Sequence, residues 1–136
     1  MNRTILTICA LLLPLTLAAD VNPTVRDIML HAITPATNAI WGIGEPSTQE
    51  EWQPFEEAAV TVLLAGNALR DANDDSQWLS WADQMTAAAA EILTAVRARD
   101  LDAVVDASNE RLYPPCEACH AVWIQAFIGR IHYGVE

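Results

Sequence analysis

Apolar residues recur at helical spacing in four successive blocks of this 136-residue chain, and almost no stretch alternates between polar and apolar residues as a strand does. Short stretches rich in polar residues, glycine or proline separate the blocks. The blocks cover approximately residues 23–42, 47–70, 76–99 and 100–136. The sequence therefore predicts an all-α protein in which four amphipathic helices form an antiparallel bundle.

Capping residues and prolines mark the expected ends and irregularities of these helices. The stretch Ser47-Thr48-Gln49-Glu50 has the form of a capping box, and Ser76 is a candidate N-cap of the third helix. Pro35 removes one main-chain donor inside the first block, which predicts a kink just before it. We expect Pro114 and Pro115 to stop or sharply kink the last helix, with a fresh turn beginning at Pro115.

The first nineteen residues, MNRTILTICALLLPLTLAA, predict a secretory signal peptide. Arg3 is their only charge, an apolar run extends from Ile5 to Leu17, and the small residues Ala18 and Ala19 follow it. The apolar run is too short to cross a bilayer. We therefore expect a mature chain of residues 20–136 that forms one helical domain in the periplasm and has no membrane span.

The chain is strongly acidic, with a formal net charge of −11 at pH 7. Loss of Arg3 with the leader makes the mature chain one unit more negative. This charge argues against nucleic acid as a partner, because phosphate backbones would be repelled. A solvated acidic surface and a docking face for a basic partner protein are the two interpretations that remain.

The stretch Cys116-Glu117-Ala118-Cys119-His120 carries two thiols and an imidazole within five residues. On a helix, positions i, i+3 and i+4 share one face. Two thiols on one face can add to the two vinyl groups of one porphyrin, and the neighbouring imidazole can bind its iron. Cys-x-x-Cys-His is the signature of c-type haem attachment. We therefore expect one covalent haem c, with Cys116 and Cys119 as its anchors and His120 as the proximal iron ligand.

Other uses of this motif stay open at the level of sequence. A zinc site needs a further ligand, for which only the distant His31 and His132 remain. A thioredoxin-like redox pair would require strands, and a disulfide between Cys116 and Cys119 would be strained within one helical turn. A haem-free role in metal binding or assembly is a further alternative for the cluster.

A signal peptide, four helical blocks and a Cys-x-x-Cys-His element near the C-terminus resemble the class II c-type cytochromes, the group of cytochrome c′ and cytochrome c556. The resemblance spans essentially the whole mature chain. It implies a four-helix bundle whose first helix crosses the distal face of the haem, and it allows a homodimer formed through the first two helices. Arg26, followed by Met29 and Leu30, is similar to the arginine and distal-face residue of that family.

The residue opposite His120 decides the function of such a protein. A methionine gives a six-coordinate electron carrier, whereas an apolar residue leaves the iron open to small gases. Met29 is our expected distal ligand because it lies on the apolar stripe of the first helix. Leu30 stands four residues after Arg26, which is the family's distal position, and implies five-coordinate iron. His31 is the rival ligand.

We therefore expect a periplasmic monohaem cytochrome that transfers one electron at a time and is not an enzyme. The alternative is a five-coordinate cytochrome c′-like protein that binds nitric oxide or carbon monoxide. Ile124 favours electron transfer, because gas-binding relatives tend to carry a basic residue four positions after the haem histidine. Arg26 is a candidate partner for a haem propionate, and Trp123 is a candidate for packing at the ring edge. We expect the physiological partner to be a redox protein with a basic docking face.

Overall fold

The structure is a computed structural model that describes residues 23–133, with side chains described for residues 23–124. Within these ranges every regular element is helical, which confirms the predicted all-α class. The predicted leader, residues 1–19, lies outside the described part of the chain. No helix in the described part is long and apolar enough to cross a membrane.

The first helical block contains a π-helical segment directly before its internal proline. Helix α1 (Val25–Ile28) continues into η1 (Met29–Ile33), a π-helix, and then into α2 (Thr34–Trp41). The ring of a proline clashes with the carbonyl four residues earlier, and a π-turn widens the helix at that place. The irregularity expected before Pro35 is therefore a wider turn of the helix.

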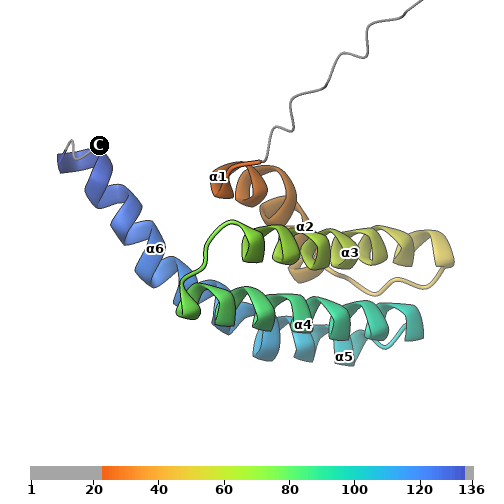
Figure 1. Cartoon of the computed structure of the whole chain (residues 1–136). Coiled ribbons are helices and arrows are strands. Elements are labelled where there is room, and N and C mark those ends of the chain that lie inside the picture. Colours follow the sequence, from red (N-terminus) through yellow and green to blue (C-terminus); the bar gives the residue numbers. More distant parts are fainter. Residues whose placement is uncertain (1–22, 134–136) are drawn as a thin grey trace, which may run out of the picture.

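Helices α3 (Gln49–Asp71) and α4 (Ser76–Ala98) lie side by side and are joined by a short turn (Figure 1). Both predicted N-caps were wrong by one residue. Thr48 caps α3, because its hydroxyl accepts the N–H of Glu51 at 3.3 Å and the Glu51 carboxylate accepts the N–H of Thr48 at 3.0 Å. Asp75 caps α4, because its carboxylate accepts the main-chain N–H groups of Gln77 and Trp78.

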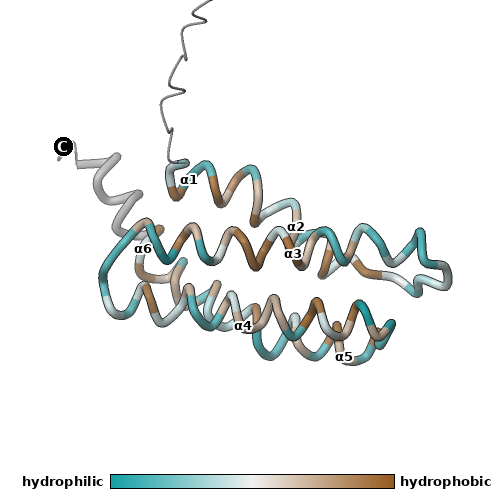
Figure 2. Tube along the Cα trace, turned by 45° about the vertical axis from the view of Figure 1, so that its right-hand side comes forward, coloured by the Kyte–Doolittle hydropathy of each residue, from teal (hydrophilic) through white to brown (hydrophobic). Residues whose placement is uncertain are grey.

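Close contact between α3 and α4 depends on a glycine and on ion pairs at the two ends of the helix pair. Gly66 lies against Thr86 and Met85 of α4. An ion pair joins Arg70 to Asp83, and at the other end Arg97 Nε lies 2.7 Å from Glu56 Oε1. Hydrophobic residues recur along these helices with hydrophilic residues between them, as expected for amphipathic helices that pack through one face (Figure 2).

The last block is one helical run in three parts: α5 (Leu101–Asp106), the π-helix η2 (Ala107–Leu112) and α6 (Tyr113–Tyr133). Of the two outcomes expected at Pro114 and Pro115, a stop and a sharp kink, the stop is wrong, because the helical run continues through both residues. The two prolines lie directly after the π-helical segment, whose wider turn makes room for their rings.

Helix α2 packs on α3, α3 packs on α4, and α4 packs on η2 and on α6. The core consists of the buried faces of these helices. Its largest fully buried side chains are Ile40, Val62, Ile92, Val104 and Leu112. Trp41 links the first and last blocks, because its Nε1 donates a hydrogen bond to Ser108 O at 3.4 Å and its ring makes an edge contact with Tyr113. Beside this contact lies a cavity.

Candidate cofactor site

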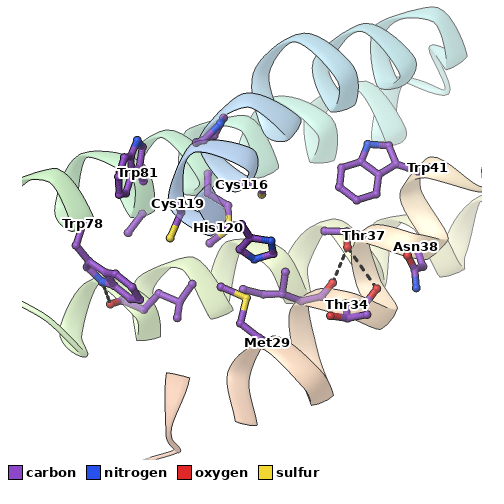
Figure 3. A pocket seen from close by; sticks show the side chains of 15 residues that line it. Met29, Thr34, Thr37, Asn38, Trp41, Trp78, Trp81, Cys116, Cys119 and His120 are labelled. Carbon is purple, nitrogen blue, oxygen red and sulfur yellow. Dashed lines mark hydrogen bonds between the residues drawn. The ribbon is translucent and has the colours of Figure 1, made fainter. Parts of the chain in front are cut away.

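A cavity of about 210 Å³ lies between the first helical block, α4 and the start of α6. Four residues singled out from the sequence line it together: Met29, Cys116, Cys119 and His120. They come from segments almost ninety residues apart. Figure 3 shows the cysteines at one end of the cavity and the Met29 and His120 side chains pointing toward one another across it.

Helix α6 places the two thiols and the imidazole in the cavity. Pro115 is buried at the base of this helix, so the first turn is firmly held, and the i, i+3, i+4 spacing brings all three side chains to the same face. Cys116 and Cys119 are half-buried and are not joined to each other, whereas His120 is exposed at the edge of the cavity. The motif therefore presents free thiols to the cavity interior.

Both thiols are protonated at neutral pH. Burial, reinforced by the neighbouring Cys119, raises the pKa of Cys116 to about 11, and burial also raises the pKa of Cys119. A catalytic redox cysteine needs the opposite shift, toward the thiolate. The thioredoxin-like interpretation therefore receives no support from the environment of these cysteines.

Segment η1 supplies Met29 to the wall opposite α6. Met29 is half-buried and lines the cavity. Leu30 is 47% exposed and His31 is also exposed, and neither lines the cavity. Of the three distal candidates, Met29 is therefore the one that shares the cavity with His120.

Tryptophan side chains form much of the apolar wall. Trp78 and Trp81 of α4 line the cavity, and Trp78 is fixed because its Nε1–H donates to Leu69 O at 2.6 Å. Trp123 packs edge-to-face on Trp78, with ring centroids 5.3 Å apart. Trp123 does not itself line the cavity, and its buried Nε1 has no hydrogen-bond partner among the described residues.

Two predicted site residues are not brought to the cavity. Arg26 is exposed on α1 and Trp123 lies behind Trp78. Their proposed roles at a propionate and at the ring edge stay predictions.

Sequence reasoning missed several residues that line the cavity: Thr34, Thr37, Asn38, Trp41 and Pro115. A weak signal for some of them exists in the sequence. Thr34, Thr37 and Asn38 are spaced i, i+3 and i+4, so they share one face of the helix, but a search for apolar stripes passes over threonine and asparagine.

The lining of the cavity fits a flat, largely apolar group that can be ligated through sulfur and nitrogen atoms. None of its fifteen lining residues is Asp, Glu, Lys or Arg. Two thiols, an imidazole and a thioether provide soft and borderline donors suited to covalent attachment and iron ligation. In the described part of the chain, no three His, Cys, Asp or Glu side chains are arranged to hold one metal ion, as a protein zinc site would require. The cavity is smaller than the ~300–1,000 Å³ of typical ligand sites, so a porphyrin would fill it and extend past its exposed end.

Comparisons with protein-family models, with curated proteins and with solved structures found no match to this chain. The function is therefore inferred from the residues that line the cavity.

Proposed function

We propose that this protein is a periplasmic monohaem c-type cytochrome of the class II group, an antiparallel four-helix bundle that carries one electron at a time. The observation that carries the proposal is the composition of one cavity. Met29 and His120 face one another across it, and the Cys116 and Cys119 thiols lie at one end of it (Figure 3).

The residues of α6 would hold the haem. Cys116 and Cys119 would form its two thioether bonds, each by adding a protonated thiol across a vinyl double bond, with no oxidant needed. The haem would supply the iron(III)/iron(II) couple when bound. His120 would bind the iron through one imidazole nitrogen and, because it follows Cys119 directly, the helix would fix its position relative to the attachment point.

Met29 is the proposed sixth ligand. Its thioether sulfur is a soft donor that favours iron(II), and its position on the half-buried face of η1 limits access of water to that side of the cavity. A filled sixth position leaves no site for a gas molecule. Electron transfer is therefore favoured over the five-coordinate alternative, in which nitric oxide or carbon monoxide would bind the open iron.

The charge of the chain fits a basic partner protein. A formal net charge of −11 at pH 7 would accelerate encounter with a positively charged redox partner, and this acceleration would weaken as ionic strength rises.

Absorption spectra of the haem-loaded mature protein test the proposed ligation. The oxidised wild-type protein should show the methionine-to-iron charge-transfer band, and Met29→Ala should lose it and gain rapid carbon monoxide binding in the reduced state. Leu30→Ala is the matched control, because Leu30 is the next residue and lies outside the cavity, and it should keep the wild-type spectrum. A wild-type protein that lacks the band and binds carbon monoxide promptly at neutral pH would support the gas-binding alternative.

A further inference from the structure

One end of the cavity is polar. Thr34, Thr37 and Asn38 lie at i, i+3 and i+4 on α2, and all three line the cavity. In Figure 3 they lie on one side of the facing Met29 and His120 side chains, while the cysteines lie on the other. We call these three residues the polar wall. Its position opposite the cysteines is the observation on which the inference depends.

Two of the three residues in the polar wall have side-chain hydrogen-bond donors that are available to a ligand. Thr37 is buried, and its hydroxyl donates to Ile33 O at 2.9 Å, so its single donor is used within the helix. The Thr34 hydroxyl and the Asn38 amide make no hydrogen bond to another described side chain, and both residues are exposed. Thr34 offers one O–H donor and Asn38 offers two N–H donors.

Haem also has one polar edge and one apolar edge. Its two propionate carboxylates lie on the edge of the porphyrin opposite the vinyl edge, where the cysteines attach. A carboxylate requires water or hydrogen-bond donors, and hydrogen bonds to an ionised group are stronger than neutral ones. Attachment of the vinyl edge at the cysteine end would therefore direct the carboxylates toward the exposed, donor-bearing end.

We propose that Thr34 and Asn38 bind the haem propionates through neutral hydrogen-bond donors. The inference rests on the proposed haem function and adds to it a carboxylate-binding subsite on α2. It also moves this role away from Arg26, which is exposed on α1 and does not line the cavity. Thr37 is a positioning residue in the same wall, because its hydroxyl bonds to the main chain of η1.

The test compares two porphyrins that differ only in their carboxylates. Hemin and hemin dimethyl ester are titrated into the full-length mature chain produced without haem and kept reduced, with tryptophan fluorescence and visible absorption as readouts. The variants are Thr34→Val with Asn38→Leu, Arg26→Gln, and the matched control Thr94→Val. Thr94 is an exposed threonine on α4 with the same hydroxyl-to-carbonyl bond that Thr37 makes, and it lies outside the cavity.

The wild-type chain should prefer hemin over the ester by about tenfold, as expected for hydrogen bonds to a charged group. The Thr34→Val, Asn38→Leu variant should lose about tenfold in affinity for hemin and nothing for the ester, while Thr94→Val and Arg26→Gln keep the preference. A double variant that keeps the full preference, or its loss in Arg26→Gln, would overturn the inference.

A separate variant distinguishes failure of the subsite from failure of the proposed function. His120→Ala should weaken binding of both porphyrins equally, because it removes the iron ligand and leaves the polar wall intact. Unchanged binding in His120→Ala would contradict the haem site itself. If the haem-free double variant does not fold, resonance Raman spectra of the haem-loaded protein replace the titration: the propionate bending band should shift in the double variant and stay in place in Thr94→Val, and an unshifted band would overturn the inference.

Discussion

Substitution of Gly66 tests the packing that holds α4, and with it one wall of the cavity, against α3. A Cβ atom at Gly66 would lie 2.3 Å from Thr86 Oγ1 and 3.3 Å from Met85 Cε. The first distance is far inside the ~3.5–4.0 Å of a normal contact. Thr86 cannot rotate away freely, because its hydroxyl donates to Ala82 O at 2.8 Å. Gly66→Ala gains about 1 kcal/mol of helix propensity, while overpacking of this kind costs about 1–3 kcal/mol and the lost hydrogen bond about 1 kcal/mol.

We therefore expect Gly66→Ala to lower the free energy of unfolding by about 1–3 kcal/mol. Urea denaturation followed by circular dichroism measures the change. Adding Thr86→Ala should restore most of the loss, because it removes the atom that clashes. Asn67→Ala, at the next and exposed position, should change stability by less than about 0.5 kcal/mol. A Gly66→Ala protein as stable as the wild type would refute the reasoning.

Two further predictions concern helix ends. Hydrogen bonds at the start of α3, chiefly from Ser47, lower the pKa of Glu51 from its usual value of 4.5, so the stabilising effect of this carboxylate is present above pH 4.5 and is lost as pH falls through the lower, folded-state pKa. Glu51→Ala should therefore reduce the urea midpoint at pH 7 and change it less at pH 3. An equal effect of Glu51→Ala at both pH values, or an equal effect of Glu50→Ala, would contradict this prediction. Arg99 ends α4 in a left-handed conformation with φ of 58°, so Arg99→Gly should stabilise the protein by about 0.5–1 kcal/mol in thermal unfolding. Ala90→Gly, at an exposed position inside the helix, should destabilise it by a similar amount, and a destabilised Arg99→Gly would contradict this prediction.

The helices could be predicted from sequence because their apolar stripes are long and regular. Ile28, Ile33, Ala36 and Ile40 of the first block are all buried, as their spacing predicts. The caps were misplaced because neighbouring residues could serve equally well by type. Both Ser47 and Thr48 are followed three positions later by a glutamate, and only the backbone conformation decides between them.

Pro114 and Pro115 were read as a possible helix stop for a related reason. A proline in a helical pattern signals that a hydrogen bond is missing, but it does not say whether the helix ends or widens. Before Pro35 and before Pro114 the chain widens into a π-helical segment, because the apolar faces on either side of each proline pack against the rest of the molecule. That choice is made by tertiary packing and cannot be read from local sequence.

The residues of the candidate site also differ in how far the sequence alone could point to them. Cys116, Cys119 and His120 could be singled out from the sequence because their spacing is distinctive, and the structure brings all three to one cavity. Met29 was one of several distal candidates, and its presence in the cavity depends on how η1 packs against the other helices. Thr34 and Asn38 carry no local signal of the role proposed for them, since polar residues on an amphipathic helix are expected to face solvent.

The most direct test of the central claim is the mass of the mature chain produced in cells with a working cytochrome c maturation system. The account predicts a chain that carries the mass of one haem after denaturation and keeps its colour in acidified organic solvent, and it predicts that Cys116→Ala with Cys119→Ala loses both properties. A colourless wild-type chain with the mass of the unmodified polypeptide would contradict it.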